Sequence, residues 1–261
     1  MIDIREAGKQ YGGIAALHGL NWSVQEGEWW GIIGPNGSGK STLLQLLSGV
    51  EKASSGKVLI HGKPASAYNR KILSRMMAVL QQDGLPPVHY PVREVLEMGR
   101  YPYQDWLGRD GGGDPDALIE SIMDKLQLHA LADRPLDELS GGQRQRVALG
   151  KVMAQEPQIL LLDEPTTYLD IRYQHQFMEL VAQWRKEEGI TVVAVLHDLN
   201  LAAQFCDKLL VLRDGQAVGM GTPEDILTEE TIRLVYGIEP VIVPHPVSGI
   251  PQVLVTRQRA D

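Results

Sequence analysis

The stretch that decides the fold is residues 34–42, which read Gly34-Pro35-Asn36-Gly37-Ser38-Gly39-Lys40-Ser41-Thr42. Glycines allow successive backbone N–H groups to turn inward around a polyphosphate, and a following helix presents its positive N-terminus to the same charge. Lys40 is placed to reach the β- and γ-phosphates, and the Ser41 hydroxyl is placed to ligate magnesium. An apolar run at 29–33 precedes the loop and a helix-forming run at 43–47 follows it. The stretch therefore predicts a binding site for a nucleoside triphosphate with Mg²⁺.

Composition narrows the class of protein. The chain has 261 residues, 43% of them hydrophobic and 22% charged, which is ordinary for a globular protein. A formal net charge of -8 argues against a general nucleic-acid binder, because such proteins are usually basic. The single cysteine, Cys206, excludes an internal disulfide and is expected in the core. Neither an apolar signal region nor a run of about 18 apolar residues occurs, so we expect the chain to serve any membrane through a partner.

Strand signals alternate with helix signals along the chain. Apolar or alternating runs predict strands at 20–24, 57–62, 76–80, 159–162 and 191–196. From 92 to about 153 the signals are mostly helical, interrupted by a glycine-rich stretch at 108–115 that we expect to be a flexible surface loop. The pattern indicates an α/β nucleotide core with a helical insertion near 85–155.

A second motif is the apolar strand at 159–162 that ends in Asp163, Glu164 and Pro165. It places two carboxylates at the carboxyl edge of a buried sheet, where ligands bind in such folds. Asp163 is placed to hold magnesium, and Glu164 is a candidate to polarise the attacking water. An acidic strand end by itself also occurs by chance, and its pairing with the phosphate loop favours the catalytic interpretation.

A third motif opens the helical run at 144–149. It reads Leu139-Ser140-Gly141-Gly142-Gln143. Ser140 is a good N-cap, and the glycines expose backbone N–H groups at a helix N-terminus, which makes a second phosphate site. One chain cannot use both phosphate sites on one nucleotide.

With this third motif, the chain resembles the ATP-binding cassette family of ATPases over about residues 1–236. The resemblance implies a P-loop NTPase (RecA-like) core with an antiparallel β subdomain and a helical insertion. We expect the core at 1–84 and 156–237, the helical subdomain at 85–155, and a C-terminal strand extension at 238–261. His245 in that extension is expected to be structural, since no second metal ligand lies at useful spacing.

The resemblance also implies roles for residues outside the three motifs. Tyr11 matches the aromatic residue that stacks on adenine, although local packing at a strand end is the alternative. Gln82, chosen over its neighbour Gln81, matches the glutamine that contacts magnesium and senses the membrane partner. His197 matches the histidine at the γ-phosphate, and Asp170 the aspartate that links two active sites across a dimer. Two copies should therefore dimerise head to tail, with ATP held between Lys40 of one copy and Leu139–Gln143 of the other.

Further stretches resemble the ATPase subunits of bacterial importers for siderophores, haem and cobalamin. These stretches are residues 95–103, 164–171 and 196–202. The resemblance implies a peripheral location on the cytoplasmic face of the membrane, a permease partner received by residues 88–103, and an extracytoplasmic substrate-binding protein as an indirect partner. A soluble non-transport cassette ATPase and an exporter ATPase are the alternatives. The acidic balance and the lack of a long heptad region in the sequence count against the first.

Overall fold

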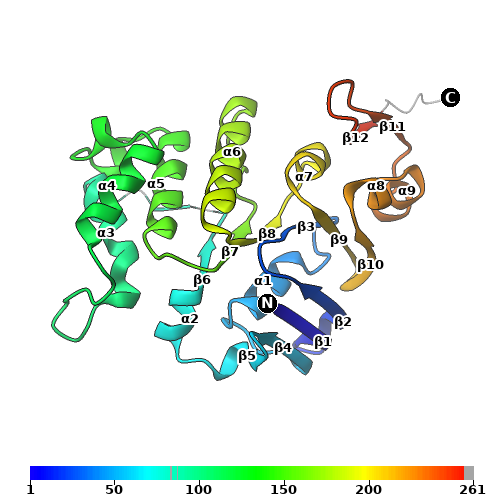
Figure 1. The fold of residues 1–261 in the computed structure, drawn as a ribbon. Coiled ribbons are helices and arrows are strands. Elements are labelled where there is room, and N and C mark those ends of the chain that lie inside the picture. The colour runs from blue at the N-terminus through cyan, green and yellow to red at the C-terminus, as the bar shows by residue number, and fades with distance from the viewer. Residues whose placement is uncertain (83, 87, 256–261) are drawn as a thin grey trace. The chain divides into compact units, whose positions relative to one another are not determined.

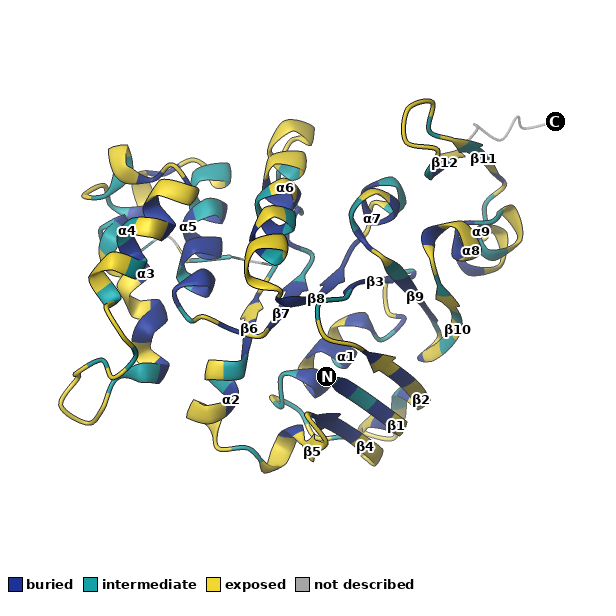
Figure 2. Cartoon of the chain, viewed as in Figure 1, coloured by how far each residue is buried: buried dark blue, intermediate teal, exposed yellow. Residues whose placement is uncertain are grey.

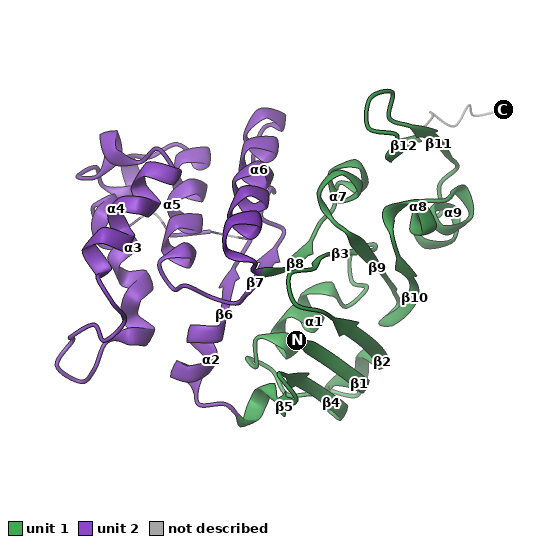
Figure 3. Ribbon diagram, viewed as in Figure 1, with its two compact units in different colours: residues 1–67, 191–261 green, residues 68–190 purple. Residues whose placement is uncertain are grey.

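The computed structural model describes residues 1–82, 84–86 and 88–255. Internal contacts divide the chain into two compact units, 1–67 with 191–261, and 68–190 (Figure 3). The domain limits predicted from the sequence stay a prediction, and residues 256–261 of the predicted C-terminal extension lie outside the described residues. No helix within the described ranges is both long enough and apolar enough to cross a bilayer.

The first unit contains an antiparallel sheet. Its strands, in the order β2-β1-β4-β5, are β2 (Ile14–Val24), β1 (Ile2–Tyr11), β4 (Ser55–Ile60) and β5 (Lys63–Pro64) (Figure 1). The predicted strands at 20–24 and 57–62 are confirmed as parts of β2 and β4, apart from a turn at 61–62. Alternate residues of β2, among them Leu20, Trp22 and Val24, are buried, as expected for a sheet with one covered face.

The same unit holds the strands that carry the phosphate loop. β3 (Trp29–Ile33) lies between β8 (Thr191–Val195) and β9 (Lys208–Arg213), parallel to both, and β10 (Gln216–Gly221) pairs antiparallel with β9. Every residue of β3 and β8 is buried (Figure 2), which explains their continuous apolar sequences. Helix α1 (Lys40–Leu47) follows the phosphate loop, and α7 (Leu199–Phe205) follows β8.

The end of the first unit is a short helical segment and a hairpin. Helices α8 (Pro223–Ile226) and α9 (Glu229–Tyr236) precede the strands β11 (Pro240–Pro244) and β12 (Pro251–Val255), which pair antiparallel. Earlier in the same unit, a 3-10 turn at Ala65–Ala67 follows β5. The strand character predicted for this extension is thus found in β11 and β12. His245 Nδ1 accepts the backbone N–H groups of Val247 and Ser248, each at 3.2 Å, so this side chain orders the turn, as expected.

The second unit is mainly helical around two parallel strands. β6 (Met77–Leu80) pairs with β7 (Ile159–Asp163), and α5 packs against α3, α4 and α6. The helical segments are α2 (Arg70–Met76), α3 (Val92–Glu97), η2 (Met98–Tyr103), α4 (Pro115–Lys125), η3 (His129–Leu131), η4 (Leu136–Glu138), α5 (Gly141–Met153) and α6 (Ile171–Glu188). The predicted insertion is therefore helical, as its sequence indicates.

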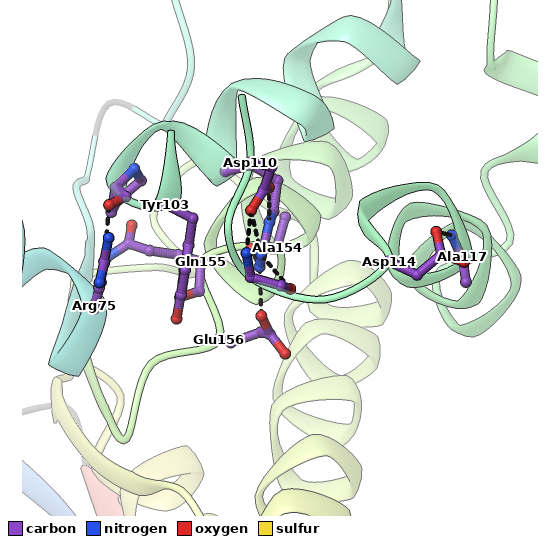
Figure 4. A network of polar contacts seen from close by, with 11 residues as sticks. Arg75, Tyr103, Asp110, Asp114, Ala117, Ala154, Gln155 and Glu156 are labelled. Carbon is purple, nitrogen blue, oxygen red and sulfur yellow. Dashed lines mark hydrogen bonds and ion pairs between the residues drawn. The ribbon is translucent and has the colours of Figure 1, made fainter. Parts of the chain in front are cut away.

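Arg100 holds part of the glycine-rich loop at 108–115 through hydrogen bonds. Figure 4 shows Asp110 and Glu156, two of the residues that surround Arg100. Its guanidinium is buried and donates to the Asp110 carboxylate at 2.8 Å, to the Gly112 carbonyl at 2.9 Å and to the Ala154 carbonyl at 3.0 Å, and it also pairs with Glu156. One buried cation therefore ties Asp110 and Gly112 of this surface loop to the end of α5, and the predicted flexibility of the loop stays a prediction. Hydrogen bonding to Arg100 lowers the pKa of Asp110 below 3.8.

Candidate nucleotide site

The phosphate loop joins β3 to α1 in the first unit. Its backbone requires glycine at two positions where neighbouring carbonyls approach closely. A Cβ at Gly34 would lie 2.1 Å from the Leu212 carbonyl oxygen, and one at Gly39 would lie 2.6 Å from the Ala16 carbonyl oxygen. Both glycines also have positive φ, 148° and 99°. The loop conformation is thus set by backbone packing that no other residue allows.

The polar groups of the loop fit a triphosphate. Helix α1 begins at Lys40 with Gly39 as its N-cap, which provides no side-chain hydrogen bond. The hydroxyl of Ser38 is buried and has no hydrogen-bond partner among the described residues. Lys40 Nζ donates to the carbonyls of Gly34 and Pro35, each at 2.9 Å, which holds the ammonium over the loop. The loop therefore carries an ammonium and a buried hydroxyl, two groups that can donate to phosphate.

Tyr11 ends β1 and lies near α1. Its hydroxyl donates to Gln45 Oε1 at 3.3 Å, and the ammonium of Lys9 lies 4.8 Å from its ring centroid. Tyr11 therefore packs locally against Gln45 and Lys9, as the alternative interpretation of this residue expects. The residue nevertheless remains 41% exposed, so its ring also has surface available for a base.

His197 leaves the same sheet edge as the phosphate loop. The backbone N–H of Leu196 donates to the Ile32 carbonyl at 3.1 Å, and β3 and β8 run parallel. His197 is the next residue and is exposed. The structure thus brings together His197 and the start of the loop, as expected for the carboxyl ends of neighbouring parallel strands.

Tyr236, at the end of α9, is a residue that the motifs do not reveal. Burial raises the pKa of its phenol to about 12, and a hydrogen bond with the backbone of Gly34 acts in the opposite direction. The tyrosine therefore contacts the first residue of the phosphate loop. The only sequence signal near Tyr236 is Gly237, which indicates the C-cap of a helix. That signal does not predict a contact with the phosphate loop.

In the second unit, Gln82, Asp163 and Glu164 lie at one sheet edge. β6 and β7 run parallel with Leu80 opposite Leu162, Gln82 lies two residues beyond β6, and Asp163 ends β7. All three polar side chains are partly exposed. Within this unit the structure places three of the predicted residues, Gln82, Asp163 and Glu164, at one sheet edge. Ser41 and His197 lie in the first unit.

The segment after β7 has an unusual backbone. Glu164 and Tyr168 have φ of 49° and 68°, in the left-handed region that favours glycine. Such strain costs on the order of 1–3 kcal/mol and persists only where neighbours hold it. Thr167 contributes, since its N–H donates to the Glu164 carbonyl at 3.2 Å and its hydroxyl to Glu164 Oε2 at 3.4 Å.

Two helices hold this segment through side chains. From α6, Gln174 Nε2 donates to the carbonyls of Thr166 at 3.2 Å and Leu169 at 3.1 Å. From α5, Gln145 Nε2 donates to the Pro165 carbonyl at 2.8 Å. Asp170 accepts the N–H of Tyr173 at 3.0 Å and is the N-cap of α6. Asp170, the aspartate predicted to link two active sites, therefore lies at the end of a loop that hydrogen bonds from α5 and α6 hold in place.

Ser140 is the N-cap of α5, which confirms that prediction. Its hydroxyl accepts the Gln143 N–H at 3.3 Å, and the Gln143 side chain accepts the Ser140 N–H at 2.9 Å, so the two form a capping box. Gly142 lies against the ring of Tyr173, where a Cβ would lie 2.8 Å from a ring carbon. The glycine is thus needed for close packing of α5 on α6.

The proposed magnesium donors are oxygen atoms of mixed type. Ser41 belongs to the first unit, and Gln82 and Asp163 belong to the second. Hydroxyl, amide and carboxylate oxygens suit the hard cation Mg²⁺, which usually binds one or two carboxylates plus substrate phosphates. Among the residues that the structure describes, no group of three or more His, Cys, Asp or Glu side chains could hold a metal ion. The site therefore fits magnesium held together with phosphate, and its assembly from the two units stays a prediction.

Comparison with known proteins identifies the family. The family model described as ABC transporter matches residues 17–167, which is more than half of the chain. The chain belongs to the ABC transporter family. It is an ATP-binding cassette ATPase with the P-loop fold that the sequence predicts.

Individual relatives agree with this assignment. Over 244 residues the cassette is 40% identical to the ferric enterobactin transport ATP-binding protein FepC of Escherichia coli, covering 94% of this chain and 90% of FepC. It is 38% identical to the uncharacterized ABC transporter ATP-binding protein YvrA of Bacillus subtilis, covering 95% of this chain but only 56% of YvrA. Among solved structures, a dimeric post-hydrolysis ATP-binding cassette bound to ADP and Pi matches with a TM-score of 0.73 and 30% identity, covering 85% of this chain and 98% of that one.

Proposed function

We propose that this cassette is the ATP-hydrolysing subunit of a bacterial importer that takes up an iron chelate (a siderophore or haem) or cobalamin. The observation that carries the cargo class is the 40% identity to the ferric enterobactin ATPase over nearly the full length of both chains. The stretches 95–103 and 196–202, which resemble the same importer class, support it. The cassette would bind a membrane permease and remain on its cytoplasmic face.

The phosphate loop would hold ATP through its backbone donors and Lys40, with Tyr11 against adenine. Ser41, Gln82 and Asp163 would hold Mg²⁺, which neutralises phosphate charge when bound. Glu164 is the group that orients the attacking water and accepts its proton, and His197 is the group that contacts the γ-phosphate. The strained backbone at Glu164 supports this assignment, because such strain clusters at active sites.

Two copies would form the active species. The backbone donors at the N-terminus of α5 and the Ser140 hydroxyl would bind the nucleotide held by the phosphate loop of the second copy. Negative phosphates neutralised from both sides then hold the dimer together, and hydrolysis releases it. A solved cassette of 30% identity that is dimeric with ADP and Pi supports this arrangement.

The permease would dock on the second unit beside α3 and η2. An open hollow of about 620 Å³ is lined there by Glu94, Glu97, Met98, Tyr101 and Gln104. Met98 and Tyr101 are exposed, so apolar surface is available to a partner segment. The hollow lies within residues 88–104, close to the range that the resemblance implies.

The test is purification of the tagged cassette from membranes of its own source, with identification of what copurifies. A permease and a substrate-binding protein would support the importer, and the ligand of that binding protein would name the cargo. Copurified ribosomes or nucleic acid would favour a soluble cassette ATPase, and an exporter-type membrane domain would favour the exporter. Either result would overturn the import proposal while leaving the ATPase intact.

A further inference from the structure

Gln145 lies where three functional segments of the second unit meet. It belongs to the first turns of α5, the helix that Ser140 caps, and it is nine-tenths buried. Its amide nitrogen donates to the Pro165 carbonyl at 2.8 Å, one residue after Glu164. A Cβ built on Gly84, two residues after Gln82, would lie 3.1 Å from its amide oxygen. The buried side chain of Gln145 therefore contacts two segments, one that follows Glu164 after β7 and one that follows Gln82 after β6.

The contact bears directly on the strained residue. Glu164 has φ of 49°, and Pro165 follows it, so fixing the Pro165 carbonyl fixes the peptide plane on the far side of that proline. Because a left-handed residue persists only where its surroundings hold it, this hydrogen bond contributes to the orientation of Glu164. A buried carbonyl left without its donor would rotate toward another partner.

Packing around Gln145 leaves little room for independent movement. The space that it lines with Gly142, Leu169 and Tyr173 amounts to about 10 Å³, which holds at most a single water. Close-packed elements of this kind shift together. A displacement of the α5 N-terminus would therefore reach the Pro165 carbonyl.

We infer that Gln145 is a positioning residue that couples the N-terminus of α5 to Glu164. The inference rests on the proposed function, in which α5 binds the nucleotide of the second copy and Glu164 acts on the nucleotide of its own chain. Gln145 is then the link by which occupation of one ATP site adjusts the catalytic carboxylate of the other. Gln174 holds the same loop from α6 and takes no part in that link.

The test is a double-mutant cycle on ATP turnover. Gln145→Met keeps the length of the side chain but removes its amide, and Gln174→Met is the matched control at the same loop. Gln145→Met should lower kcat by about tenfold to a hundredfold, because small misplacements of catalytic groups cost that much, while the Kd for ATP changes less than about twofold. Gln145→Leu, which also lacks a donor, should behave the same way if the methionine variant is poorly folded.

The cycle adds Ser140→Ala to each background. If Gln145 carries the coupling, Ser140→Ala should cost at least about fivefold less in kcat in the Gln145→Met background than in the wild type. In the Gln174→Met background, the fold reductions in kcat caused by Gln174→Met and by Ser140→Ala should multiply, as expected for independent residues. Multiplying losses in both backgrounds, or an unchanged kcat in Gln145→Met, would overturn the inference. A wild-type chain that hydrolyses no ATP would instead overturn the proposed function.

Discussion

The N-termini of α1 and α5 are both predicted phosphate sites, and the structure builds them differently. Helix α1 has Gly39 as its N-cap without a side-chain hydrogen bond, whereas α5 is closed by the capping box of Ser140 and Gln143. Gly39 therefore gives the first helix no side-chain cap, whereas the N-cap of the second helix hydrogen-bonds within its own capping box. In the proposed function, α1 would bind the phosphates of its own chain's nucleotide, and α5 would contribute to a nucleotide brought by a second copy.

The largest effect should follow a change at α1. Lys40→Ala removes the ammonium that donates to two loop carbonyls, and charge-assisted hydrogen bonds to two phosphates contribute about 1.5–3 kcal/mol each. We expect ATP affinity or turnover to fall about a hundredfold or more, measured by nucleotide titration and phosphate release. Lys208→Ala, which breaks a salt bridge to Glu28 in the same unit, should leave both unchanged. Unchanged nucleotide binding together with unchanged turnover in Lys40→Ala would contradict the loop assignment.

A smaller effect should follow a change at α5. Ser140→Ala removes a cap and should lower stability by about 1 kcal/mol. It should also lower ATP turnover about tenfold, because a donor to the partner's nucleotide is lost, while the isolated chain keeps its ATP affinity. Thr222→Ala is a matched control, since Thr222 and Asp225 form a capping box on α8. That variant should lose similar stability with normal turnover; equal turnover in the two variants would remove the catalytic role of Ser140.

Sequence patterns predicted the features that are encoded by adjacent residues and did not predict contacts between residues far apart in the chain. The strand–loop–helix around Lys40 and the cap at Ser140 are encoded by adjacent residues, so the sequence predicted both. The extent of β1 was not predicted, because register shifts between Ile4 and Ala7 break its alternation. Tyr236 against Gly34 and Gln145 against Pro165 join residues far apart in the chain, and no local pattern encodes such contacts.

The smallest effect should follow a change in the loop that Arg100 holds, and this change should alter only the free energy of unfolding. Asp110→Asn should lower the free energy of unfolding by on the order of 1–3 kcal/mol at pH 7, because it removes the charge that pairs with a buried guanidinium. The pKa of Asp110 lies below its ordinary 3.8 in the folded chain. The advantage of the wild type should therefore be complete above about pH 4 and disappear as pH falls through the folded-state pKa. Denaturant unfolding of both proteins across that range tests it, and a constant difference would contradict the ion pair.

We propose that phosphate is bound by α1 of one copy and α5 of another. The most direct measurement is the solution mass of Glu164→Gln with and without ATP and Mg²⁺, because loss of a general base slows turnover about 10²–10⁴-fold and preserves the bound state. We expect the mass of one chain without nucleotide and of two chains with it. Adding Ser140→Arg should return the mass to that of one chain, with ATP still bound. A nucleotide-loaded Glu164→Gln chain that stays monomeric would contradict the claim.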